Sequence, residues 1–200
     1  MKHLTQRELK SAGVGGSRYD AKVLGAPFPV FLVNGFETKI DPATKKTLTE
    51  IHDLPGLLAA VVKARIFHEQ KLAGPDLKFI RSALCVKSGF LANMIGVTPE
   101  HYCRCEAGTK VMSAAQEKLY RMFVFFCISS KDKSLCDGVE RVRTETPHSE
   151  KAMKDELDSL RKMFFDMKID PVRSAKDEMA FVFNRKPRER DEDGDWRDAA

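Results

Sequence analysis

The middle of the chain carries apolar side chains at helical spacing. Between residues 55 and 71 they recur three and four positions apart, which predicts a first helix. Gly74-Pro75 then starts another, because proline suits the first turn of a helix. Three more short helices follow up to residue 126. The buried stripes of these four later helices are predicted to be Leu77, Ile80, Ala83 and Leu84; Leu91, Ala92 and Ile95; Tyr102 and Cys105; and Leu119, Met122, Phe123 and Phe126.

Capping residues separate these helices from one another. A polar N-cap or a proline marks each predicted start, and a glycine marks a predicted end. The last helix opens with the S-x-x-Q pattern of a capping box. In chain order the signals are Ser88, Gly96, Thr98 with Pro99, Gly108, and Ser113 with Gln116.

Three β-rich stretches flank the helices. FPVFLV and FETKI surround Asn34-Gly35, a dipeptide that suits a type I′ turn, so a β-hairpin is predicted there. LTEIHD at 48–53 could add a short strand. EMAFVFN near the C-terminus could extend the hairpin into a sheet. The expected fold class is therefore α+β, mainly α with a small β region.

The last third of the chain holds one amphipathic pattern and one charged tail. Apolar residues with heptad spacing predict a helix over 149–168, which either pairs with its twin in a dimer or folds back on its own chain. The tail NRKPRERDEDGDWRDAA mixes charges of both signs and is expected to be disordered, with Trp196 either exposed or an anchor for a partner. The heptad residues are Met153, Leu157, Leu160, Phe164 and Met167.

These patterns divide the chain into five parts. Residues 1–20 form an expected flexible arm, which is either an ordinary frayed terminus or a basic arm for nucleic acid. The hairpin and first helix (21–71) are a candidate dimerisation region. A helical domain (72–130) precedes a C-terminal helix and strand (131–184) and the charged tail (185–200).

Composition narrows the classes of function. Lys and Arg number 34 against 29 Asp and Glu, a net charge of +5. Residues 1–71 and 72–126 are positive and residues 127–200 are negative, which permits a polyanionic partner for the first two segments. The five cysteines form no C-x-x-C pair, so reduced thiols are expected. No apolar run reaches the roughly 20 residues of a membrane span, and no signal peptide is evident, so we expect a cytoplasmic protein with no membrane contact.

Residues 77–108, LKFIRSALCVKSGFLANMIGVTPEHYCRCEAG, resemble the Xre-type (Cro/C1-type) DNA-binding domain. The usual sequence of that family has a helix that ends in an Arg-containing "LR..L", followed by "LA..LGVS" and then "WE.G". The segment before it is similar to the antitoxin-like regulators related to MqsA, and together the likeness covers about residues 28–126. The resemblance implies a lambda-repressor-like helix-turn-helix domain, here preceded by a β-hairpin and helix and followed by a helical extension. The residues that carry it are Leu91, Ala92, Gly96, Val97, Thr98, Glu106 and Gly108.

The chain departs from this family at three points. MqsA carries a zinc module held by cysteines, whereas no cysteine here precedes Cys85, so no metal or other cofactor is expected. The usual Gln at the start of the second helix is Ser88, which changes an expected DNA contact. The usual Trp before the Glu is Cys105, which puts a smaller group in the core.

His101, Cys103 and Cys105 lie close together in sequence but not on one side of a helix. At 100° per residue, Cys103 and Cys105 point about 160° apart, so they cannot hold one tetrahedral metal without unwinding the helix. Cys105 is predicted to lie in the core beside Tyr102. Cys103 is predicted to lie on the outer face, where its oxidation could block a partner.

The resemblance places that outer face in the major groove of DNA. Arg104 could read guanine, and Glu100 could accept a hydrogen bond from cytosine or instead favour the helix dipole. Ser88, Thr109 and Lys110 are expected at phosphates. The complete predicted DNA-binding set is Ser88, Thr98, Pro99, Glu100, His101, Cys103, Arg104, Thr109 and Lys110.

These expectations combine into one function and two alternatives. The chain is expected to be a homodimeric, sequence-specific transcriptional regulator of double-stranded DNA, a repressor rather than an activator, which binds an inverted repeat near its own or a neighbouring operon. An antitoxin that also neutralises a toxin protein, or an adaptor that has lost DNA binding, are the alternatives. An enzyme is not expected, because the histidines sit in no nucleophile or metal motif.

Overall fold

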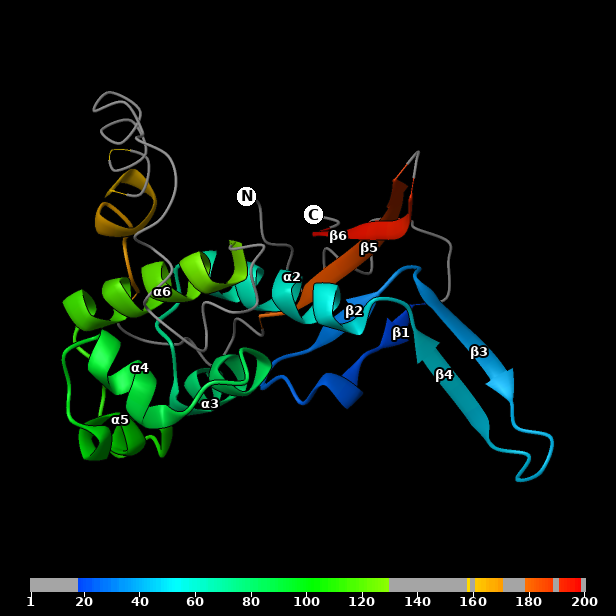
Figure 1. Ribbon diagram of the computed structural model, residues 1–200, viewed down its shortest axis with the longest axis horizontal. Helices are drawn as coiled ribbons and strands as arrows, with labels where there is room; N and C mark the ends of the chain where they lie inside the picture. Colours follow the sequence, from blue (N-terminus) through cyan, green and yellow to red (C-terminus); the bar gives the residue numbers. More distant parts are fainter. Residues whose placement is uncertain (1–17, 130–157, 159–160, 171–178, 189–190, 199–200) are drawn as a thin grey trace, which may run out of the picture. The chain divides into compact units, whose positions relative to one another are not determined.

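The structure is a computed structural model of the 200-residue chain. It describes residues 18–129, 158, 161–170, 179–188 and 191–198 (Figure 1). The described residues form helices together with small sheets, in agreement with the α+β class. The chain divides into two compact units, residues 1–65 with 174–200 and residues 66–173. No helix within the described ranges is long and apolar enough to cross a membrane.

The first unit contains a four-stranded sheet that brings distant parts of the chain together. The parallel pairing of β2 with β5 places Val30 opposite Phe181 and Leu32 opposite Phe183, and all four are buried. Antiparallel pairs flank it on both sides. The strand order is β1-β2-β5-β6, where β1 is Tyr19–Asp20, β2 is Val30–Leu32, β5 is Phe181–Arg188 and β6 is Asp191–Asp198.

Both faces of the β2–β5 pair carry apolar side chains. On one face the rings of Phe28 and Phe181 meet edge to face, with centroids 5.1 Å apart. The opposite face carries a smaller cluster, because successive side chains along a strand alternate between faces. Its members are Ala180 and Val182, with Phe31 and Val33 packed against them.

The predicted hairpin at Asn34-Gly35 is wrong. Gly35 does adopt a positive φ of 75°, but β2 before it joins the four-stranded sheet and β3 (Phe36–Ile40) pairs with β4 (Thr47–Ile51). The side chain of Asn34 explains the divergence. Its Nδ2 donates to the carbonyl of Arg185 at 3.0 Å and its Oδ1 accepts from the Arg185 N–H at 2.6 Å, so the amide continues the β5 pairing in place of backbone.

The predicted strand at 48–53 is confirmed as β4, and the hairpin lies one connection later than predicted. The turn between β3 and β4 is ordered by Asp41, whose carboxylate accepts hydrogen bonds from the Ala43 N–H and the Thr44 hydroxyl. These bonds lower the pKa of Asp41. On the exposed strands, Lys39 bridges Glu37 and Glu50 at 3.3 and 2.9 Å.

Two predictions about the chain ends are also corrected. The tail was expected to be disordered, yet β5 runs to Arg188 and β6 follows, with Lys186 opposite Asp195 and Arg188 opposite Asp191. The backbone of this charged segment is therefore paired as two antiparallel strands. At the other end, Tyr19–Asp20 already form β1, and residues 1–17 of the predicted arm lie outside the described residues.

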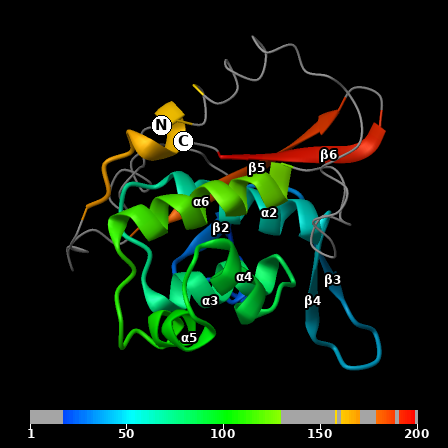
Figure 2. The same cartoon turned by 60° about the vertical axis from the view of Figure 1, so that its left-hand side comes forward.

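The predicted first helix is α2 (Leu54–Phe67), which begins one residue earlier and ends four residues earlier than expected. Four short helices follow in the second unit and pack into one cluster (Figures 1 and 2). The Gly96 and Gly108 ends are confirmed, with φ of 68° and 74°. Ser88 is not a cap, because the N-cap is Lys87 and no side chain bonds there. The helices are α3 (Gly74–Ala83), α4 (Ser88–Met94), α5 (Pro99–Glu106) and α6 (Ala114–Ser129).

The capping box of α6 is confirmed, but its predicted buried stripe is wrong. The Ser113 hydroxyl and the Gln116 side chain bond each other's backbone N–H at 3.3 and 3.1 Å. The side facing the cluster is instead formed by Glu117, Tyr120, Arg121 and Val124, all with 0% exposure. Phe126 is 48% exposed, and Leu119, Met122 and Phe123 are only partly buried.

A buried ion pair explains why α6 turns this side inward. The Glu117 carboxylate accepts from Arg121 Nη2 at 2.7 Å and from the Leu72 N–H at 2.9 Å. Arg121 donates hydrogen bonds to backbone carbonyls at the end of α2 and just beyond it. Carbonyls at a helix C-terminus have no partner within the helix. Its guanidinium donates to the carbonyls of Ile66 at 2.8 Å, His68 at 2.5 Å and Gln70 at 2.7 Å.

The predicted helix over 149–168 is described only near its C-terminal end. Residues 161–165 form the π-helical turn η4, and the helix stops there rather than at Lys168. Phe164 is completely buried, with its ring centroid 5.5 Å from Phe67 and 5.6 Å from Phe125, so this part folds back on its own chain. Met153, Leu157 and Leu160 lie outside the described residues.

Candidate nucleic-acid interface

Helices α4 and α5 are joined by a tight turn. The positive φ of Gly96 ends α4, and the Val97 N–H donates back to the Ala92 carbonyl at 3.0 Å. Thr98 then caps α5, as predicted, because its Oγ1 accepts from the His101 N–H at 3.2 Å. Pro99 occupies the first position, where no N–H is needed. The sequence therefore fixes the angle between two packed helices over only four residues.

The inner face of α5 is held in the core. Tyr102 and Cys105 are 0% and 2% exposed, which confirms their predicted burial, and the Tyr102 ring lies 6.3 Å from that of Tyr120 in α6. Burial raises the pKa of both tyrosines and of the Cys105 thiol. Cys105 is thus a small protonated core residue rather than a reactive thiolate.

An ion pair fastens the C-terminal end of α5 to α3. Arg81 Nε donates to Glu106 Oε1 at 2.6 Å, and this carboxylate raises the pKa of Arg81. The two residues stand at the "LR..L" and "WE.G" positions of the sequence motif. The motif named both residues, but their pairing could not be inferred because it depends on how α3 crosses α5.

Gly74 allows the start of α3 to touch the end of α5. A Cβ at Gly74 would lie 2.5 Å from the Glu106 carbonyl oxygen and 2.8 Å from that of Cys105. Backbone atoms cannot yield as a flexible side chain can. We expect Gly74→Ala to lower the free energy of unfolding by about 1–3 kcal/mol, as overpacking does.

Gly89 in α4 is the matched control for this prediction. A Cβ there meets nothing within 4 Å, so Gly89→Ala should raise the stability by about 0.5–1 kcal/mol through the lower entropy of the unfolded chain. Urea denaturation of both variants measures the difference. Equal effects of the two substitutions would show that α3 and α5 do not approach so closely.

The outer face of α5 is exposed, as predicted. Cys103 is exposed where Cys105 is buried, which confirms that the pair points to opposite sides. His101 is half-buried at the margin, and within the described structure its Nε2 has no hydrogen-bond partner. Among the described residues no group of three His, Cys, Asp or Glu could hold a metal. The exposed outer face consists of Pro99, Glu100, Cys103, Arg104 and Ala107.

Several groups expected to contact DNA are already engaged. The nearby Glu100 backbone N–H and Thr98 hydroxyl lower the pKa of the Glu100 carboxyl, with a smaller contribution from the charge of Arg104. Glu100 lies in the first turn of α5, next to the N-cap Thr98. At the other end, the Arg104 carbonyl accepts from the Thr109 N–H at 3.0 Å, the Lys110 N–H at 3.1 Å and the Thr109 hydroxyl at 3.1 Å.

Because of these contacts, fewer of the predicted DNA-binding residues have a donor available for DNA. The bonds to the Arg104 carbonyl use the backbone N–H groups of Thr109 and Lys110 and the Thr109 hydroxyl. They do not use the Lys110 ammonium. Ser88 is half-buried at the start of α4. Lys78 in α3, Lys87 at the N-cap of α4 and Lys110 after α5 are exposed, as is Arg104. We call these three lysines the basic margin.

Comparison with family models, with curated proteins and with solved structures finds no match for this chain. Its function is therefore inferred from α4, α5 and the residues around them. Three properties of this region are informative together: an inner face fixed in the core, an exposed outer face, and a basic margin.

Proposed function

We propose that this chain is a sequence-specific regulator that binds double-stranded DNA through α5. In this proposal α4 and α5 form a helix-turn-helix unit of the lambda-repressor-like kind, and α5 enters the major groove. The carrying observation is that α5 is anchored on its inner face while its outer face presents Arg104. A helix held in this way can make contacts with base edges whose geometry is already fixed.

The outer face has the chemistry to read a base pair. A guanidinium can donate two hydrogen bonds to O6 and N7 of guanine, the commonest specific contact in the major groove. The neighbouring side chains Pro99, Cys103 and Ala107 are small, so the helix can approach the bases closely. The place of Glu100 in the first turn of α5 and its lowered pKa support the dipole role over the cytosine contact for that residue.

The basic margin would hold the phosphates. Lys78, Lys87 and Lys110 can neutralise backbone charge, which orients the protein without reading sequence. One helix of eight residues reads few base pairs, so two copies on an inverted repeat would supply the specificity of a regulator. A repressor that acts on its own or a neighbouring operon remains the form of regulation that we propose.

The test is fluorescence anisotropy on duplexes selected from a random library and on the DNA upstream of the coding sequence. We expect Arg104→Ala to weaken binding to the preferred duplex by about 1–3 kcal/mol, roughly 5- to 150-fold, and to relax specificity at one position. Lys87→Ala is the matched control. It should weaken binding to all duplexes alike and reduce the salt dependence by about one ion.

Two outcomes would overturn the proposal. Equal, strongly salt-dependent binding to every duplex would leave only electrostatic attraction and favour an adaptor that has lost DNA binding. An unchanged preferred sequence in the Arg104→Ala variant would exclude α5 as the reading helix.

A further inference from the structure

Helix α6 has an apolar stripe that faces outward. Leu119, Met122, Phe123 and Phe126 have the spacing of one helical face, yet the cluster of helices packs against the opposite side, where Glu117 and Arg121 lie. Phe123 reaches Phe90 of α4, with ring centroids 5.8 Å apart. The remainder of the stripe has no comparable cover among the described residues, and Phe126 is 48% exposed.

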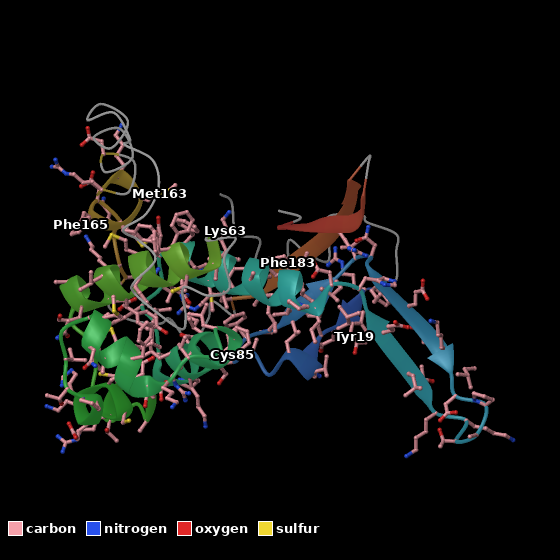
Figure 3. All side chains as sticks on the ribbon, in the orientation of Figure 1. Tyr19, Lys63, Cys85, Met163, Phe165 and Phe183 are labelled. Atoms are coloured by element: carbon pink, nitrogen blue, oxygen red, sulfur yellow. The ribbon has the colours of Figure 1, made fainter. Side chains whose placement is uncertain are left out.

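Residues of η4 extend this stripe into a patch. Met163 and Phe165, which are labelled in Figure 3, are 43% and 55% exposed. Lys118 of α6 donates a hydrogen bond to the Phe165 carbonyl, which holds η4 against α6. We call Leu119, Met122, Phe126, Met163 and Phe165 the α6–η4 patch. Exposed apolar side chains gathered on two packed elements are typical of interaction sites.

The α6–η4 patch faces away from α5. Tyr120 on the inner side of α6 meets Tyr102 of α5. In both ribbon views η4 lies on the side of α6 away from α4 and α5 (Figures 1 and 2). A molecule that covers the patch would therefore leave the outer face of α5 open.

We propose that the α6–η4 patch is a dimer interface that binds the same patch of a second copy of this chain. The five side chains of the patch carry no charge, so its partner must be apolar there. Its charged rim includes exposed residues of both signs, Asp158 and Asp166 with Arg161 and Lys162. A two-fold axis can set each sign against its opposite, because an isologous interface is self-complementary.

The exposed aromatic rings supply only part of the area that a dimer interface needs. At about 200 Å² for a whole aromatic side chain, the exposed parts of Phe126 and Phe165 supply roughly 200 Å² per copy, or about 400 Å² when two patches meet. A specific interface buries roughly 1,000 Å² or more in total, so the rim must be buried as well. The proposal rests on the proposed function in one respect, since reading an inverted repeat requires two copies.

The test is sedimentation equilibrium of the full chain without DNA, over about two decades of concentration around the micromolar range. The wild type should pass from the mass of one chain to that of two. Phe126→Glu should raise the dissociation constant at least about tenfold, because a carboxylate would be buried without a partner. Val23→Glu is the matched control, a 72% exposed apolar residue in the other unit, and should leave the equilibrium unchanged.

A second variant distinguishes loss of the dimer from loss of the fold. Met163→Glu alters the patch from η4 rather than from α6, and circular dichroism checks that each variant keeps its helices. A wild type that stays monomeric at every concentration would overturn the proposal and show that the patch is covered by its own chain or by another protein. An unchanged dimer in both folded variants would also overturn it.

The proposed dimer and the proposed DNA contact can be tested separately. Arg104→Ala should lose specific DNA binding while it keeps the dimer. Phe126→Glu should keep affinity for a single half-site but lose the added affinity for an inverted repeat. A dimer with no sequence preference would uphold the interface and reject the proposed function, and specific binding by a strict monomer would do the reverse.

Discussion

Arg121→Ala is expected to lower the free energy of unfolding of the second unit by about 3–5 kcal/mol, the usual cost of removing one partner of a buried ion pair. Arg121 and Glu117 are both fully buried. The substitution removes the guanidinium from the Glu117 carboxylate, and it removes the Arg121 donor from three carbonyls in the last turn of α2 and the connection to α3. Urea denaturation followed by far-UV circular dichroism measures the change.

Arg104→Ala is the control, because it makes the same substitution at an exposed arginine of the same unit. It should change stability by less than about 0.5 kcal/mol. The double variant Glu117→Leu with Arg121→Met should recover part of the loss by removing both charges. It should stay below the wild type because the carbonyls of Ile66, His68 and Gln70 would still lack the hydrogen bonds that Arg121 donates. Similar stability of the two arginine variants would contradict the buried network.

Phe164→Ala should cost about 3–5 kcal/mol, as other large-to-small substitutions of buried aromatic residues do. Its ring is fully buried and packs on Phe67 and Phe125. The loss would show that η4 is docked on the helices that precede it. Thermal and urea denaturation at low protein concentration measure it.

The adjacent Phe165 provides the comparison, because it is 55% exposed. At a concentration where the chain is monomeric, Phe165→Ala should change stability by no more than about 0.5 kcal/mol. A reversal of the two effects would mean that η4 turns its other side toward α6.

Local signals predicted much of the helical region. Thr98, Pro99, Gly96 and Gly108 act where they stand in the sequence, because a cap or a left-handed glycine depends on the nearest few residues. The opposite faces of Cys103 and Cys105 also follow from helix geometry alone. These features need no knowledge of the rest of the fold.

Predictions that depended on distant partners were wrong. The apolar stripe of α6 does exist. However, Glu117 and Arg121 are buried because Arg121 bonds the carbonyls at the end of α2 and just beyond it. The spacing of apolar residues does not reveal such a contact. The turn at Asn34-Gly35 does exist, but its strands pair elsewhere because the Asn34 side chain bonds Arg185, 151 residues away. The charged tail was predicted to be disordered because its composition does not reveal the pairing of β5 with β6.

The candidate interface was predicted in outline and not in its details. The exposed face of α5 followed from the capping signals and the resemblance, and Arg104 has the predicted exposure. For Glu100 the sequence left a cytosine contact and a role at the helix dipole both open. The role of Thr109 could not be foreseen, because it depends on which backbone groups the end of α5 leaves to be satisfied. Charge and residue type alone do not distinguish a capping group from one that contacts a ligand.

The pairing of β2 with β5 bears on the order in which the chain folds during its synthesis. The two strands are about 150 residues apart, and contacts between such distant segments form late. The ribosome completes the helices of residues 66–129 before it makes β5, so the second unit can fold while β2 has only the two-residue β1 beside it. During that interval Val30, Phe31 and Leu32 are an apolar segment without its main partner, and transiently exposed surface of this kind is prone to aggregation.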